Sequence, residues 1–185
     1  APPVTHTDCA SARERLADSG LSFVGQGPVT NAVQALQAAD EHGYPLVLKA
    51  LGRLHKSDGG GVALAIAHDE QLARTYEDFA TRLAAPRCSL ERMAPLADGL
   101  ELLIGARWDP RFGPVVLAGS GGVYAEVLRD TMVALAPVTE SQARTMLAAL
   151  RCAPLLRGAR GRAPLDVAAA AAALAALSRV AAGHP

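Results

Sequence analysis

Apolar positions three and four residues apart mark several amphipathic helices along this chain. Asp8, Asp69 and Thr139 are able to cap the helices that they begin. Gly20 and Gly43 end the first two helices, as glycines commonly do. The pattern predicts helices at Asp8–Gly20, Thr30–Gly43, Asp69–Leu83, Thr139–Leu150 and Leu165–Ala182.

Short apolar runs bounded by turn residues predict strands. These runs lie at residues 21–24, 45–50, 62–67, 90–93, 100–108, 114–118 and 123–128. A tight turn at Gly119 to Gly122 explains these glycines more simply than a second phosphate loop with Glu126. Because hairpins and helices are segregated, without a regular strand–helix–strand alternation, we expect an α+β sandwich instead of a doubly wound parallel sheet.

Charge and composition exclude several classes of function. The chain of 185 residues carries eighteen basic and eighteen acidic residues, so it lacks the positive field that non-specific nucleic-acid binding needs. Its apolar runs fall short of the roughly 20 residues that cross a bilayer, and its first residues have no feature of a secretory signal. We therefore expect a soluble, cytoplasmic protein with no nucleic-acid or membrane partner.

The three cysteines, Cys9, Cys88 and Cys152, lie far apart and lack CxxC spacing. This pattern indicates neither a disulfide framework nor a zinc site, and we expect mostly buried, reduced thiols. Seven other basic or titratable residues are expected at the surface: Arg157, Arg160, Arg162, His6, His42, His68 and His184.

The segment KALGRLHKSDGGG, from Lys49 to Gly61, follows an apolar strand and combines two lysines with glycines. Glycines let backbone N–H groups approach phosphate oxygens, and lysines add compact positive charge. The segment is not a Walker A loop, because GxxxxGK[ST] followed by a helix is absent. Taken alone, it is more often a flexible surface hairpin with solvated lysines.

The longer run GYPLVLKALGRLHKSDGGGVALAI resembles the ATP-grasp signature of ADP-forming acetyl-CoA and acyl-CoA synthetases, relatives of the succinyl-CoA synthetase β subunit. The later stretches LERMAPLADGLELLIGARWDPRFGPVVLAGSGGVYAEVLRD and CAPLLRGARGRAPLD resemble that family in the same order. The resemblance implies an α+β ATP-grasp fold with antiparallel-rich sheets and flanking helices. It implies a smaller nucleotide-binding lobe at about 21–95 and a second lobe made of 1–20 and 96–185.

The resemblance also implies roles for individual residues. The phosphates would be held by Lys49, Lys56, Ser57, Gly59, Gly60 and Gly61. Glu91 would hold the adenine amino group beside Met93, and Glu101 would face the ribose. His55 would carry a phosphoryl group, for which imidazole is suited, or would only donate a hydrogen bond to phosphate. Without the family context, each glutamate would be interpreted as an exposed charge at a strand edge.

The function implied is the ATP/ADP-binding part of an NDP-forming acyl-CoA synthetase that interconverts acyl-CoA, ADP and phosphate with acid, CoA and ATP through phosphohistidine. Mg²⁺ is the expected metal, with ligands beyond residue 185 and none within this chain. CoA-binding and acyl-phosphate-forming domains, or a subunit carrying them, are the expected partners. We therefore expect weak nucleotide binding without turnover from these residues alone.

Two alternatives remain open from the sequence. The same synthetase-like module occurs next to a GNAT domain in bacterial protein lysine acetyltransferases, where it would sense a ligand. An inactive ATP-grasp interaction domain is the other alternative, and retention of Lys49, His55, Lys56, Glu91 and Glu101 argues against it. The acyl substrate is not determined by this sequence.

Overall fold

The computed structural model describes residues 9–24, 27–51, 60–85, 87–95, 99–122 and 125–183. The chain divides into two compact units. Residues Phe23–Ala94 form one of them, here called the four-stranded unit after its sheet. Residues Ala1–Ser22 and Pro95–Pro185 form the other, here called the three-stranded unit.

The sheet of the four-stranded unit is antiparallel, in the order β1-β4-β2-β3. Its strands are β1 (Pro28–Val29), β2 (Leu46–Ala50), β3 (Val62–Ile66) and β4 (Cys88–Arg92). The strands β2 and β3 form the predicted hairpin around the glycine-rich segment, and β2 lies between β3 and β4. The end of β2 that carries Lys49 is therefore bordered by strands on both sides.

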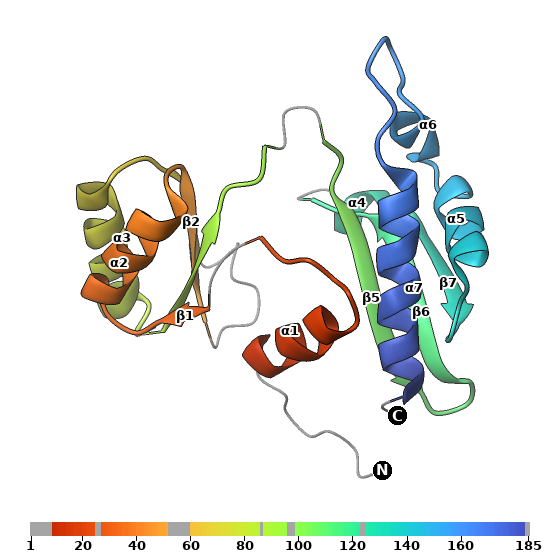
Figure 1. The fold of residues 1–185 in the computed structure, drawn as a ribbon, viewed down its shortest axis with the longest axis horizontal. Coiled ribbons are helices and arrows are strands. Elements are labelled where there is room, and N and C mark those ends of the chain that lie inside the picture. Colours follow the sequence, from red (N-terminus) through yellow and green to blue (C-terminus); the bar gives the residue numbers. More distant parts are fainter. Residues whose placement is uncertain are drawn as a thin grey trace. The chain divides into compact units, whose positions relative to one another are not determined.

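Helices α2 (Ala32–His42) and α3 (Asp69–Arg82) lie on one side of this sheet (Figure 1). Their apolar side chains enclose Leu46, Leu48 and Leu90, which are fully buried. Asn31 caps α2, and His68 caps α3 in place of the expected Asp69; each side chain accepts a hydrogen bond from the backbone N–H three residues on. Gly43 ends α2 at φ +69°, a conformation that favours glycine.

The three-stranded unit contains an antiparallel sheet in the order β5-β6-β7. Its strands are β5 (Leu102–Asp109), β6 (Gly113–Ser120) and β7 (Thr131–Leu135), and its helices are α1 (Cys9–Asp18), α4 (Ala125–Leu128), α5 (Glu140–Ala148), α6 (Ala153–Leu156) and α7 (Val167–Gly183). Helix α7 runs along β5 and β6, with α5 beside it (Figure 1). Leu147 and Leu174 from these helices are fully buried against Val116 of the sheet.

Two buried polar side chains tie loops to this core. The Oγ of Ser178 accepts a hydrogen bond from the N–H of Val138 at 3.0 Å and donates to the carbonyl of Ala175 at 2.7 Å. The carboxylate of Asp130 accepts from the N–H groups of Arg151 and Cys152, both at 2.8 Å. Burial opposes ionisation of Asp130, yet these two hydrogen bonds hold its pKa below the ordinary value.

The five helices predicted from apolar spacing are confirmed as α1, α2, α3, α5 and α7. Thr139 is confirmed as the N-cap of α5, where it forms a capping box with Gln142. The Asp8 cap lies outside the described residues. Between α5 and α7, where no element was predicted, the chain forms the single-turn helix α6.

Two strand predictions were wrong. Residues 21–24 form no strand, and the sheet edge is built by β1 instead. The run at 123–128 contains helix α4, and the third strand of the sheet is β7, which was not predicted. A four-residue apolar segment is too short for its periodicity to separate a helix from a strand.

The turn predicted at Gly119 to Gly122 begins later than expected, because Gly119 and Ser120 belong to β6. A Cβ on Gly119 would lie 2.7 Å from the carbonyl oxygen of Asp130 and 2.8 Å from a methyl carbon of Thr131. Glycine is therefore required at this position by the close approach of β6 to the start of β7.

The described thiols agree with the expectation of reduced cysteines. Cys88 is buried and Cys152 is half-buried, and both are free. Burial raises the pKa of each thiol to about 11, so neither has the thiolate character of a reactive cysteine. The expectation that His42 is a surface residue was wrong, since it is half-buried and its Nε2 is enclosed, with no hydrogen-bond partner among the described residues.

No helix among the described residues combines the length and the apolar character needed to span a membrane.

Candidate functional site

Lys49 projects from the face of the four-stranded sheet that is turned away from α2 and α3. Its neighbours in β2, Leu48 and Ala50, are fully buried in the core, and successive side chains of a strand point to opposite faces. The side chain of Lys49 is 36 % exposed. Its ammonium group is therefore held by the sheet but remains accessible to a ligand.

Two side chains of β4 lie beside Lys49. The strand register pairs Lys49 with Ser89, and Glu91 follows two residues later on the same face. Lys49 Nζ donates to Glu91 Oε2 at 2.6 Å, and Ser89 Oγ donates to Glu91 Oε1 at 3.0 Å. Lys49, Ser89 and Glu91 are called the polar cluster below.

The polar cluster is bordered by apolar side chains. Val47 lies opposite Glu91, and Val62 lies opposite Lys49 on β3, so both occupy the same face. A sheet surface with a few convergent polar groups among apolar side chains is typical of a small-molecule site. A partly exposed ion pair adds at most about 1 kcal/mol to stability, so the main consequence of the Lys49–Glu91 contact is the placement of a donor beside an acceptor.

The two ends of this face are defined by backbone contacts. At one end, Met93 N–H donates to the carbonyl of Pro45 at 3.0 Å, just beyond β4. At the other end, Ala50 N–H donates to the carbonyl of Gly61 at 2.8 Å and closes the base of the glycine-rich segment. The structure thus brings the predicted residues Met93 and Gly61 to opposite ends of the strands that carry the polar cluster.

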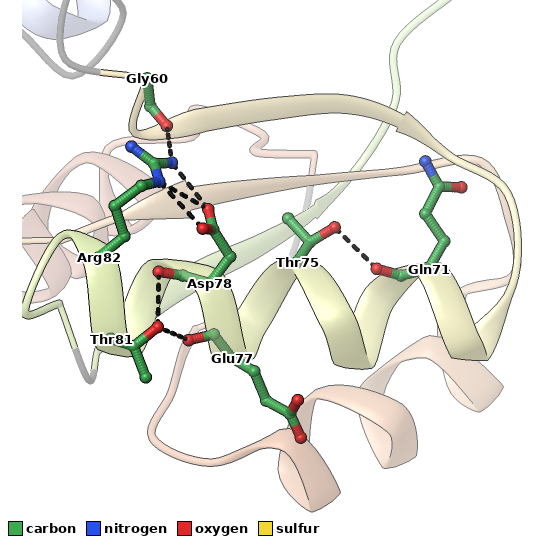
Figure 2. Close-up of polar contacts among 7 residues, drawn as sticks. All are labelled: Gly60, Gln71, Thr75, Glu77, Asp78, Thr81 and Arg82. Carbon is green, nitrogen blue, oxygen red and sulfur yellow. Dashed lines mark hydrogen bonds and ion pairs between the residues drawn. The ribbon is translucent and has the colours of Figure 1, made fainter.

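Arg82, near the end of α3, reaches the same segment from the helix side (Figure 2). Its Nη2 lies 3.5 Å from the carbonyl oxygen of Gly60, and it also donates to Asp78 Oδ2 at 2.7 Å. The hydrogen bonds from Arg82 lower the pKa of Asp78. Asp78 therefore orients a guanidinium group that contacts the second arm of the β2–β3 hairpin.

Four predicted site residues lie outside the described residues: His55, Lys56, Ser57 and Gly59. The proposed phosphoryl carrier is among them, so its role stays a prediction.

Glu101 belongs to the three-stranded unit and directly precedes β5. Its carbonyl accepts from the N–H of Gly121 at 2.8 Å. A Cβ on Gly122, at φ +78°, would lie 2.6 Å from Glu101 Oε2. The absence of a side chain at Gly122 therefore leaves space for the carboxylate of Glu101, which is an exposed residue.

Within the described ranges, no group of three or more His, Cys, Asp or Glu side chains is arranged to hold a metal ion.

Comparison with known proteins places this arrangement in a family. Residues 5–185 match the family model of an ATP-grasp domain. The chain belongs to the ATP-grasp family. Its α+β fold with antiparallel sheets and flanking helices is confirmed by this match and by the structure.

The related proteins are acyl-CoA synthetases. The chain is 39 % identical over 183 residues to a trans-feruloyl-CoA synthase from an unknown prokaryotic organism, covering 94 % of this chain and 26 % of that protein. It is 36 % identical over 150 residues to the β subunit of the ADP-forming acetate–CoA ligase I of Pyrococcus furiosus, covering 76 % of this chain and 64 % of that subunit. The resemblance of this ATP-grasp domain to ADP-forming acyl-CoA synthetases is thus confirmed.

A solved structure of similar fold is the acetyl-coenzyme A synthetase 1 of Ca. Korarchaeum cryptofilum in complex with coenzyme A and Ca-AMPCP. The two structures align with a TM-score of 0.83 and 30 % sequence identity, and the alignment covers 94 % of this chain and 79 % of that chain. Another structure of that enzyme contains coenzyme A and Mg-AMPPCP, and its phosphohistidine segment points towards the nucleotide-binding site. It aligns with a TM-score of 0.77 and 30 % identity, over 95 % of this chain and 78 % of that chain. The present ATP-grasp domain spans about a quarter of the length of the feruloyl-CoA synthase.

Sequence reasoning did not identify Ser89, Asp78 or Arg82 as part of the site. Ser89 lies just outside the strand predicted at 90–93; a strand beginning at Cys88, as β4 does, would have placed it on the face of Glu91 by alternation. Asp78 and Arg82 have the i,i+4 spacing of a helical ion pair. The contact of Arg82 with Gly60 has no sequence signal, since 22 positions separate the two residues.

Proposed function

We propose that this ATP-grasp domain is the ATP/ADP-binding part of an NDP-forming acyl-CoA synthetase. The observation that carries the proposal is the polar cluster, in which a strand lysine and a carboxylate lie 2.6 Å apart on the face turned away from the helices. The related proteins that bind nucleotide analogues or act as ADP-forming ligases support it. The nucleotide-binding lobe is proposed at about 21–95 and the second lobe at 1–20 and 96–185.

The polar cluster suits the edge of adenine that carries N6 and N7. Adenine presents a donor at N6 and an acceptor at N7 along this edge. Glu91 offers an acceptor and Lys49 a donor in adjacent positions, and Ser89 holds the second carboxylate oxygen. Guanine presents acceptors at both O6 and N7, so the Glu91 carboxylate disfavours it. We therefore propose ATP instead of GTP as the ligand.

The remaining contacts extend the proposal along the nucleotide. Met93 would line the base, and Glu101 would face the ribose. Lys49, whose ammonium group has three donors, would also meet the phosphates, together with Lys56, Ser57 and the glycines at 59–61, where Arg82 contacts the carbonyl of Gly60. Mg²⁺ would neutralise the phosphates when bound, and its ligands are proposed beyond residue 185.

We propose two alternative roles for His55, as a phosphoryl carrier or as a residue that only binds phosphate. As a carrier, its ring nitrogen takes the phosphoryl group from an acyl phosphate, releasing the carboxylate, and then passes it to ADP to form ATP. As a binding residue, it donates a hydrogen bond to phosphate. Acid-labile phosphate on His55 supports the carrier, and label on any other residue contradicts it.

The partners proposed are the CoA-binding and acyl-phosphate-forming domains or subunit of the same synthetase. Relatives of this domain include β subunits and longer chains. This supports the proposal that other domains or subunits act together with this domain, but it does not identify each of them. A cytoplasmic location, where ATP and CoA are available, belongs to the same proposal. No observation favours a GNAT partner or an inactive domain.

Calorimetric titration with ATP and Mg²⁺ tests the proposal. We expect Lys49→Ala and Glu91→Ala each to weaken binding at least ten-fold, because each removes one half of the donor–acceptor pair. Glu91→Gln keeps a carbonyl acceptor for N6 and should weaken binding less than Glu91→Ala.

Arg74→Ala is the matched control, since Arg74 forms an exposed ion pair with Glu70 on α3. Equal heats from the wild-type protein and Lys49→Ala would contradict the assignment of the site. GTP binding as tight as ATP binding would contradict the role given to Glu91.

A further inference from the structure

A second candidate site lies in the three-stranded unit, between α5, α6 and the start of α7. A cavity of about 340 Å³ opens there, and Figure 1 shows these three helices gathered on one side of the unit. Its interior surface is formed by apolar side chains, among them Leu147, Leu156 and Val167, with Ala168 leaving space at the first turn of α7. A volume of this size falls in the range of small-molecule pockets.

Two arginines line the same cavity. Arg144 comes from α5, where it shares one side of the helix with Leu147 three positions later. Arg157 comes from the residue that ends α6. No carboxylate in the described part of the chain forms an ion pair with either arginine. Both arginines are exposed. The cavity therefore combines an apolar interior with two exposed arginines along its lining, neither of which has a counter-ion among the described residues.

The acidic residue nearest in sequence to the cavity is already engaged. Asp166 precedes α7 and accepts a hydrogen bond from the N–H of Ala169 at 2.8 Å, so its carboxylate caps the helix. Leu165 and Val167, on either side of it, pack into the core of the unit. Asp166 is thus held as a capping residue in the turn before the helix.

We propose that this cavity binds a small amphiphilic carboxylate, with its apolar body against Leu147, Leu156 and Val167 and its carboxylate on Arg144 and Arg157. Arginine presents a planar fork of donors that matches a carboxylate. At about 30 Å³ of liquid volume per water molecule, the cavity accommodates on the order of ten non-hydrogen atoms. The ligand class is therefore a medium-chain or single-ring carboxylic acid. The site does not involve the polar cluster, which lies in the other unit.

Calorimetric titration of the protein with octanoate tests this proposal. We expect the double variant Arg144→Met with Arg157→Met to weaken octanoate binding at least ten-fold. The matched control is the double variant Arg111→Met with Arg179→Met, which removes the same charge from exposed positions of the same unit that do not line the cavity. This control should bind octanoate as the wild type does.

Ala168→Leu tests the cavity independently of charge, because the larger side chain occupies the space at the first turn of α7. It should also weaken octanoate binding at least ten-fold, and octan-1-ol, which lacks the carboxylate, should bind at least ten-fold more weakly than octanoate. Lys49→Ala should leave octanoate binding unchanged, which separates this site from the proposed nucleotide site. Unchanged binding in the Arg144 and Arg157 variant or in Ala168→Leu, or equal affinity for octan-1-ol, overturns the proposal.

Discussion

The two sheets of this protein each have helices on one face, and their opposite faces differ in chemistry. In the four-stranded unit, that face carries the polar cluster around Lys49. In the three-stranded unit, the face turned away from α5 and α7 carries Val133 and Leu135, which are 59 % and 58 % exposed. The buried core of each unit lies on the helix-covered face of its sheet. Side chains on the opposite faces can therefore vary in polarity with little effect on stability. The following substitutions test this difference between the two faces.

The largest effects are expected in the two cores. Leu48 and Leu174 are both fully buried, one in each unit, and replacing a buried leucine with alanine leaves a cavity that costs about 3 kcal/mol. We expect Leu48→Ala and Leu174→Ala each to lower the free energy of unfolding by about that amount in urea denaturation. A loss below about 1 kcal/mol in either variant would contradict the core assignment of that unit.

Gly119→Ala should destabilise the three-stranded unit by about 2 kcal/mol, as overpacking a close contact does. The new Cβ would lie 2.7 Å from the backbone oxygen of Asp130, which cannot move without shifting β7. Gly105 in the neighbouring strand β5 has no atom within 4 Å of an added Cβ, so Gly105→Ala is the control. Equal melting temperatures for the two variants would show that the β6–β7 contact is not the reason for Gly119.

Asp130→Asn should lower stability at neutral pH by about 1–3 kcal/mol, because the buried carboxylate that accepts two backbone N–H groups is lost. The pKa of Asp130 is lower in the folded state than in the unfolded chain. Its stabilisation is therefore present above the unfolded pKa and is lost as the pH falls through the folded pKa.

Urea denaturation of the wild type and Asp130→Asn between neutral and acidic pH measures this difference. The stability gap should narrow as the pH falls, whereas Asp18→Asn, at the exposed end of α1, serves as the control. A gap that stays constant with pH would show that the charge of Asp130 is not what stabilises the turn at residues 151 and 152.

Lys49→Met tests whether the polar cluster contributes to ligand binding and not to stability. It removes a partly exposed ion pair, which costs at most about 1 kcal/mol of stability, while the proposed ATP binding should be lost. A stability loss as large as that of Leu48→Ala would mean that the polar cluster supports the fold instead of a ligand.

The smallest effect is expected for Val133→Thr. The side chain is exposed and already sits in a strand, where threonine is favoured, so the change in unfolding free energy should stay within about 0.5 kcal/mol. A larger loss in thermal denaturation would show that this face is packed in the folded protein.

Prediction from the sequence succeeded where local periodicity and capping agree with the tertiary structure. The helix at α5 has both an apolar side and the Thr139 cap, and the hairpin of β2 and β3 follows two apolar runs around a glycine-rich segment. It failed at α4, whose Val127 and Leu128 are apolar but exposed. A short apolar run predicts burial only if another element is there to cover it.

For the candidate site, the sequence identified Lys49 and Glu91 but not their direct contact. The two residues are 42 positions apart, and only the pairing of β2 with β4 brings them within hydrogen-bond distance. Ser89 joins them through the same register. The acceptor beside the donor, which favours adenine in the proposed function, is therefore a product of strand pairing.

The sequence by itself determined the helices, the hairpin around Lys49 and the family, because these depend on the order and spacing of neighbouring residues. The tertiary structure decided the face on which Lys49, Ser89 and Glu91 meet, the need for glycine at 119, and the cavity beside Arg144 and Arg157. These features depend on contacts between residues far apart in the chain. Strand register and helix packing set such distances, and no local pattern encodes them.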